Sequence, residues 1–407
     1  MALALLFSTG AVISLGISAQ DIEAGVGNAR NQMIWAALYL VSAVLLARSG
    51  HAWDVVARMP KSGWALLALI ALSALWSVEP AETVRRVIAL MGSTMIGLAL
   101  GARFGPDGFL RAHGLAVALA VVASFAVAVM APDLAVTIDE RGDAFQGAFS
   151  HKTMLGLVMA WGVAATCLLA WGSRGGTRAA WTLVALASLA LLAMSGSRTG
   201  MVVLALASAV CWGAILLRRR GSMLVVGIAC IVLTVVVAVS ILATLNWEGL
   251  TTVLGRDPTL TGRTTIWAAV IKSIEQRPMF GFGFAAFWGD FESPARNVWA
   301  ELGFGIGRTT FRPTSSHSGW LDLWLQVGIV GVALYATTLA IALRRCLAAI
   351  GHHATPGTIA CLLFVVYFTF SSLVDGTLVA SNHVFWVALV AVLVQPEPRE
   401  KVRRAGD

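Results

Sequence analysis

Long apolar runs recur along the whole chain, and short polar connections separate them. An α-helix needs about 20 predominantly apolar residues to cross a bilayer, so runs of this kind indicate membrane-spanning helices. Bounded at charged residues, glycines and prolines, the runs predict about 12 transmembrane helices. They lie near residues 2–18, 33–47, 64–78, 87–101, 115–131, 153–172, 181–194, 201–217, 223–244, 319–343, 358–374 and 383–394. We therefore predict an all-α polytopic membrane protein in which residues 1–407 form a single integral membrane domain.

Basic residues mark every second connection between the predicted helices. Arg58, Arg103 and Arg345 lie in such connections, whereas the intervening connections carry acids such as Glu79 and Asp139. Cytoplasmic loops of membrane proteins are enriched in Lys and Arg. The alternation therefore predicts that both termini are cytoplasmic and that the acidic connections lie outside.

The composition excludes several functional classes. Only 12% of the residues are charged and 58% are hydrophobic, whereas soluble proteins carry about 25% charged residues, so a water-soluble enzyme is excluded. The formal charge of +8 is explained by basic loops, and no nucleic-acid partner is expected. The five cysteines lie inside or at the edges of apolar runs without metal-ligand spacing. We therefore expect no disulfide framework, metal site or cofactor.

One connection is much longer than the others. Residues 245–318 lie between predicted helices 9 and 10 on the outward side, where a typical connection has about 4–6 residues, so a functional outward-facing loop is indicated. The loop contains a predicted helix from Thr261 to Gln276. Its apolar positions form one stripe, made of Ile266, Trp267, Val270, Ile271 and Ile274.

Two arginines on the outward side are candidates for binding an anion. Arg198 lies in a short connection of serines and glycines between two spans, and its alternative is an arginine that extends to the membrane interface. Arg263 begins the loop helix on its apolar stripe, after Thr261 as the expected N-cap. A helix N-terminus with a guanidinium group suits a diphosphate; an arginine paired with a nearby carboxylate is the alternative.

His317 is the candidate general base. Ser315 or Ser316 is expected to cap the following helix and to place His317 in its first turn. There the helix dipole would lower the imidazole pKa and favour the neutral form that a base requires. The alternative is a hydrogen-bonded structural histidine.

The outward connection at residues 139–152 supplies a further set of polar groups. Arg141, His151 and Lys152 suit contacts to phosphate or to sugar hydroxyls, and a solvated polar loop is the alternative. The glycines of Gly281–Gly283 lack the strand and lysine of a phosphate-binding loop, so we assign them to loop geometry. His352 and His353 are adjacent and lack metal-ligand spacing.

Six short motifs follow one another along most of the chain. They are Trp76–Pro80, Phe149–Lys152, Ser195–Gly200, Gly262–Trp267, Pro278–Gly283 and Ser316–Gly319. As an ordered set they resemble the motifs of the O-antigen ligase and polymerase superfamily.

The resemblance implies a GT-C-like, metal-independent glycosyltransferase of the bacterial inner membrane, with its active site facing the periplasm. Its donor would be an undecaprenyl-diphosphate-linked glycan. Arg198 and Arg263 would hold the diphosphate, and His317 would activate or position the acceptor hydroxyl.

The His151-Lys152 motif most resembles that of exopolysaccharide polymerases, so the expected reaction polymerises exopolysaccharide or O-antigen repeat units. Arg141, His151 and Lys152 are then assigned to the second lipid-linked repeat unit. The alternative is a ligase that transfers the glycan to lipid A-core. Other polysaccharide assembly and export proteins are implied as partners. A more distant alternative is a lipid or sugar transporter or flippase, which tends to show internal repeats and polar groups at the bilayer midplane.

Overall fold

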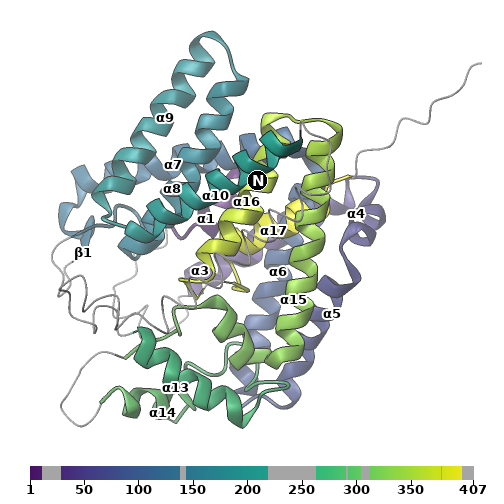
Figure 1. Cartoon of the computed structure of the whole chain (residues 1–407), viewed down its shortest axis with the longest axis vertical. Coiled ribbons are helices and arrows are strands. Elements are labelled where there is room, and N and C mark those ends of the chain that lie inside the picture. The colour runs from purple at the N-terminus through teal and green to yellow at the C-terminus, as the bar shows by residue number, and fades with distance from the viewer. Residues whose placement is uncertain are drawn as a thin grey trace, which may run out of the picture.

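The computed structural model describes residues 1–11, 29–137, 144–218, 263–289, 292–303, 312–376 and 378–396, and this part of the chain is mostly helical (Figure 1). In chain order the helices are α1 (Ala2–Ser8), α3 (Ala29–Ala47), α4 (Ala52–Arg58), α5 (Lys61–Leu72), α6 (Pro80–Arg103), α7 (Pro106–Met130), α8 (Lys152–Gly172), α9 (Gly175–Met194), α10 (Arg198–Arg218), α13 (Arg263–Gln276), α14 (Ala295–Glu301), α15 (Gly319–His352), α16 (Pro356–Ser371) and α17 (Val384–Leu393). Two short strands, β1 (Val136–Thr137) and β2 (Ala144–Phe145), pair antiparallel.

The helices confirm an all-α polytopic membrane protein. Among the described residues, α6, α7, α8, α9 and α15 are long and apolar enough to cross a membrane, and α3 with α4 would form a sixth span broken by a 107° bend. Large apolar side chains on their outer faces are exposed, including Leu183 and Val122, as expected of surfaces that face lipid. The predicted span 223–244 and residues 12–18 of the first predicted span lie outside the described residues, so the number of spans stays a prediction.

The helix at the predicted span 383–394 is too short to cross the membrane completely. It is the ten-residue helix α17, which at 1.5 Å per residue is about 15 Å long, or half of the hydrocarbon thickness. Every residue of α17 is buried. It packs along the second half of α6, where Gly97 and Gly101 let its backbone approach closely. Helix α16 has 16 residues, and every residue after Pro356 is buried. Both helices belong to the core of the bundle.

The connections that the sequence assigns to the cytoplasm meet at one end of the bundle, which we call the basic end. There the Arg345 Nη1 atom donates to the carbonyl oxygens of Arg58 (2.7 Å) and Leu393 (2.6 Å). The Asp107 side chain accepts a hydrogen bond from the backbone N–H of Gly357 (2.9 Å). The predicted sidedness of these connections is therefore consistent with their positions in space.

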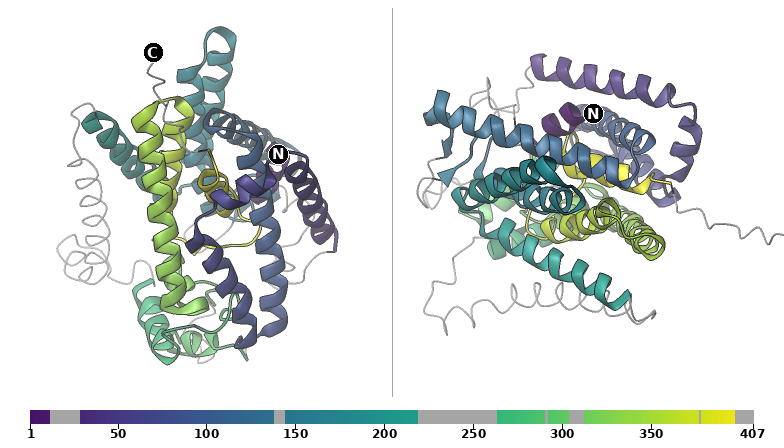
Figure 2. Two further views of the ribbon diagram at one scale, coloured as in Figure 1. Left: turned by 90° about the vertical axis from the view of Figure 1, so that its right-hand side faces the viewer. Right: turned by 90° about the horizontal axis from the view of Figure 1, so that it is seen from above.

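The opposite end, which we call the loop end, holds α13 and α14 beside the start of α15 (Figures 1 and 2). Two of the ordered motifs contact each other here, because the indole N–H of Trp76 donates to the carbonyl oxygen of Phe280 (3.1 Å). The backbone N–H of Val78 likewise donates to the carbonyl oxygen of Phe282 (3.0 Å). Motifs that are about 200 residues apart in the chain thus form one structure.

Helix α15 is interrupted at Gly328, whose φ of 70° and ψ of −176° are not helical. The segment Pro278–Gly283 fills the interruption. The N–H of Phe282 donates to the carbonyl oxygen of Leu325 (2.8 Å), and that of Ile329 donates to the carbonyl oxygen of Pro278 (2.9 Å). The segment therefore satisfies backbone groups that the interrupted helix leaves free, and the assignment of Gly281–Gly283 to loop geometry is confirmed.

Replacing Gly328 with alanine should strongly destabilise the protein. Only glycine readily adopts this backbone conformation, and a Cβ atom would overlap the carbonyl group of Met279. We expect a loss of about 3 kcal/mol or more, measured as a lower thermal midpoint of the detergent-extracted protein. Gly351→Ala, in the last turns of the same helix with open space around it, is the matched control and should leave the midpoint unchanged or slightly raised. Equal midpoints for the two variants would contradict this account.

Candidate active site at the loop end

Helix α13 (Arg263–Gln276) lies within the predicted helix 261–276, and the expected N-cap Thr261 lies outside the described residues. Ile266, Val270 and Ile274 are buried along its inner face, whereas Ile271 of the predicted stripe is 47% exposed. The buried residues form a small core of their own at the loop end. This core includes Ile266, Ala269, Val270, Ile274, Phe282, Phe287, Ala295, Val298, Trp299 and Leu325. Because Leu325 belongs to α15, the core holds α13 against the start of that helix.

Trp267 connects α13 to the segment that carries His317. Its indole N–H donates to the carbonyl oxygen of Ser316 (2.8 Å). Arg263 lies one helical turn before Trp267 on the same face, and Ser316 directly precedes His317. The bond therefore explains why the charge of Arg263 acts on the imidazole of His317. The half-buried indole needs such a partner, but the sequence does not indicate which one.

The segment around His317 is a tight turn held by a buried carboxylate. Asp322 accepts hydrogen bonds from the backbone N–H of Ser316 (3.0 Å) and from the indole N–H of Trp288 (2.9 Å). The hydroxyl of Ser316 donates to the carbonyl oxygen of Ser318 (2.8 Å). Asp322 thus supports the turn that carries His317.

The predicted N-cap of α15 is wrong by two or three residues. The N-cap is Ser318, not Ser315 or Ser316, and the helix begins at Gly319. His317 therefore precedes the helix and has a left-handed backbone with φ of 55°. The physical reason is that the hydroxyl of Ser316 bonds within the turn and is not used to cap the helix.

The pKa of His317 is lowered from 6.5 to about 4. Burial is the largest cause, and the nearby charges of Arg263 and His151 follow. Removal from water and neighbouring cations both disfavour the protonated imidazole. The sequence predicts a neutral imidazole through the helix dipole, and in the structure burial and nearby charge favour the same form.

His151 lies within electrostatic range of His317, although the two are far apart in the sequence. It is the N-cap of α8, where its Nδ1 atom accepts a hydrogen bond from the backbone N–H of Thr153 (3.1 Å). Lys152 is the first residue of α8. The structure therefore brings the His-Lys motif to the His317 site, while Arg141 lies outside the described residues.

Helix α10 begins at Arg198, whose side chain lies outside the described part of the structure. Its first turn packs closely on α8. A Cβ atom on Gly156 would overlap the side chain of Ser197, and one on Gly200 would lie 2.9 Å from the carbonyl oxygen of Gly156. These glycines let the N-terminal turns of α8 and α10 lie side by side, which places the backbone of Arg198 near His151 and Lys152.

Three helix N-termini thus lie around His317, those of α8, α13 and α15, and α10 begins beside α8. The first N–H groups of a helix lack intrahelical acceptors and carry partial positive charge. Together with Arg263 they form an electropositive site that suits an anionic ligand. Within the described ranges, no group of His, Cys, Asp and Glu residues fits a metal ion.

The fold and this site define a polytopic helical membrane protein with a cluster of helix N-termini around His317 at one end. Residues 183–336 match the family described as O-Antigen ligase, and this segment contains Arg198, Arg263 and His317. Over 202 residues, the chain is 29% identical to the exopolysaccharide production protein ExoQ of Rhizobium meliloti (strain 1021). That alignment covers 49% of this chain and 46% of the relative, so the chain spans about half of its length. The two matches confirm the resemblance to the O-antigen ligase and polymerase superfamily.

Proposed function

We propose that this protein is a glycosyltransferase that polymerises lipid-linked repeat units of an exopolysaccharide or O-antigen at the outer face of the bacterial inner membrane. The donor would be a glycan attached to undecaprenyl diphosphate. The observation that carries the proposal is that Arg263 and the N-termini of α8, α13 and α15 lie around a neutral His317. This arrangement offers positive charge for a diphosphate and a proton acceptor beside it.

In the proposed reaction, the hydroxyl oxygen of the acceptor sugar forms a bond to the anomeric carbon of the donor. The bond between that carbon and the diphosphate oxygen breaks, and its electrons remain on the leaving oxygen. His317 takes the proton of the acceptor hydroxyl. Arg263, Arg198 and the helix N–H groups stabilise the negative charge that develops on the diphosphate.

Binding of the donor would also raise the pKa of His317. In the unliganded site the charge of Arg263 helps to lower the pKa of His317. A bound diphosphate would offset that charge and raise the pKa again. The imidazole would then be a stronger base in the donor complex than in the free protein, where it has only to stay neutral.

Two observations support polymerisation over ligation. The relative from Rhizobium meliloti is described as an exopolysaccharide production protein, and the His-Lys motif lies at the same site as His317. A polymerase needs contacts for a second lipid-linked molecule, which we assign to His151, Lys152 and Arg141. The match to the O-Antigen ligase family keeps transfer to lipid A-core as the second candidate.

Purified protein that receives only lipid-linked repeat units should produce a ladder of longer lipid-linked glycans, seen by gel electrophoresis or mass spectrometry. Lys152→Ala should shorten or weaken the ladder, because one contact to the second ligand is lost. Lys61→Ala, at the start of α5 and distant from the site, is the control for loss of a lysine. No ladder from the unmodified protein, combined with transfer once lipid A-core is added, would replace the polymerase proposal with the ligase.

On the acid side, the kcat/KM of glycan transfer should fall at a pH well below the pKa of an ordinary histidine. The protonated imidazole cannot accept a proton, so kcat/KM should fall only as the pH approaches the pKa of His317, about 4. Initial rates of transfer measured between pH 3.5 and 8 check this, with intact donor quantified at each pH. A midpoint near the usual histidine value of about 6.5 would mean that His317 is neither buried nor beside Arg263 in the active protein.

A further inference from the structure

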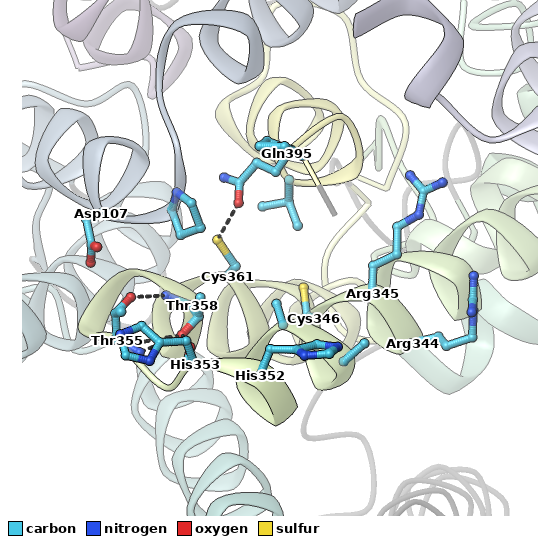
Figure 3. Close-up of a pocket in the computed structure, with 15 residues that line it drawn as sticks. Asp107, Arg344, Arg345, Cys346, His352, His353, Thr355, Thr358, Cys361 and Gln395 are labelled. Carbon is cyan, nitrogen blue, oxygen red and sulfur yellow. Dashed lines mark hydrogen bonds between the residues drawn. The ribbon is translucent and has the colours of Figure 1, made fainter. Parts of the chain in front are cut away.

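The basic end of the bundle contains a cavity that the proposed function does not use. Its volume is about 370 Å³, and it lies between the start of α7, the last turns of α15, the start of α16 and the chain that follows α17 (Figure 3). A cavity of this size falls within the range of small-ligand sites. It lies at the opposite end of α15 from His317.

The rim of this cavity is basic. Arg344 and His352 lie two helical turns apart on the same face of α15, and His353 follows at its C-terminus. Among the lining residues the single acid is Asp107, which already accepts a hydrogen bond from the first turn of α16. The structure describes no carboxylate paired with Arg344. The cavity therefore has an excess of positive charge at its opening.

The inner wall supplies a polar donor. The side-chain oxygen of Gln395 accepts a hydrogen bond from the thiol of Cys361 (3.5 Å). Its amide nitrogen is buried and has no hydrogen-bond partner within the described part of the chain. A buried donor without an acceptor is unfavourable, and an oxygen atom of a ligand in the cavity would satisfy it. Beside Gln395, the cavity is lined by apolar or weakly polar groups such as Val392, Ala349 and Cys346.

This combination suits an anionic oxygen group attached to an apolar body. Basic connections of the chain meet at this end, and the positive-inside rule places such an end at the cytoplasmic leaflet. That leaflet carries anionic lipids, and basic cavities between transmembrane helices bind their head groups. We propose that the cavity lined by Arg344, His352 and Gln395 binds the phosphate group of an anionic phospholipid.

The test compares ligands on the full-length protein in a zwitterionic detergent. Short-chain phosphatidylglycerol is titrated while the thermal midpoint of the protein is followed, since a ligand that binds only the folded state raises it. Phosphatidylcholine of the same chain length and inorganic phosphate are the parallel arms. Arg344→Ala combined with His352→Ala removes the rim charge. Arg111→Ala, an exposed arginine near the start of α7 that does not line the cavity, is the matched control.

Phosphatidylglycerol should raise the midpoint of the unmodified protein and of Arg111→Ala, and phosphatidylcholine should not. The double variant should bind it about tenfold more weakly or worse. If inorganic phosphate gives the same stabilisation with the same dependence on Arg344 and His352, the ligand is a free phosphate in place of a lipid. Equal stabilisation of the double variant and the unmodified protein by phosphatidylglycerol would overturn the proposal.

Discussion

Replacing Arg263 with alanine should abolish glycan transfer while the protein remains inserted and abundant. Arg263 is the first residue of α13, and its charge acts on His317. In the proposed reaction, this charge would stabilise the negative charge that develops on the leaving diphosphate. Losing one such group costs about 100-fold to 1,000-fold in rate in other enzymes. Arg263→Lys should recover only part of the activity, because an ammonium group cannot reproduce the two parallel hydrogen bonds of a guanidinium.

The chain offers a matched control on the same helix. Lys272 lies on the outer face of α13, where it forms an exposed ion pair with Glu301 (2.9 Å). Exposed pairs contribute little to stability, so Lys272→Ala removes the same charge without disturbing the site and should transfer glycan normally. Arg198→Ala should fail as Arg263→Ala does. Transfer at a normal rate by Arg263→Ala, at normal expression, would mean that the diphosphate does not bind here.

Replacing His317 with alanine should block transfer from any donor, with a loss of about 100-fold to 10,000-fold, the usual contribution of a general base. The measurement is the initial rate of chain extension with saturating lipid-linked repeat units. Donor binding should be largely retained, because Arg263 and the helix N-termini remain. A loss in kcat with little change in KM would therefore identify a role in the chemical step.

A second variant separates chemistry from conformation at this position. His317 has a left-handed backbone with φ of 55°, which asparagine tolerates better than alanine. His317→Asn should therefore keep the turn and the thermal midpoint, yet be as inactive as His317→Ala because its amide is not a base. Recovery of activity by asparagine would show that position 317 acts through the shape of the turn.

The sequence alone determined the class of the protein and much of its order along the chain. Apolar runs predict buried or membrane-spanning helices because apolar side chains are favoured both in the hydrocarbon of the bilayer and in a protein core. For this reason α6, α7, α8, α9 and α15 lie where the runs do. Helical periodicity likewise predicted α13 and most of its buried face. The ordered motifs were sufficient to indicate the superfamily.

The hydropathy of the sequence could not determine how deeply a helix is buried in the protein or how long the helix is. Helix α17 has the apolar composition of a membrane span, yet it is a ten-residue helix buried against α6. Transfer from water to lipid and transfer from water to a protein core have similar free energies. Which of the two surrounds a helix depends on its neighbours in space, such as the glycines of α6.

The site itself required the tertiary structure. The sequence places His151, Arg263 and His317 on three separate segments, and it assigned the low pKa of His317 to its own helix. In the structure, the hydrogen bond from Trp267 to Ser316 connects α13 to the turn that carries His317. Burial, Arg263 and His151 together lower the pKa of His317. Electrostatic effects act through space over a few ångströms. Local sequence patterns therefore identify the residues, whereas the long-range packing of α8, α13 and α15 decides what they do to one another.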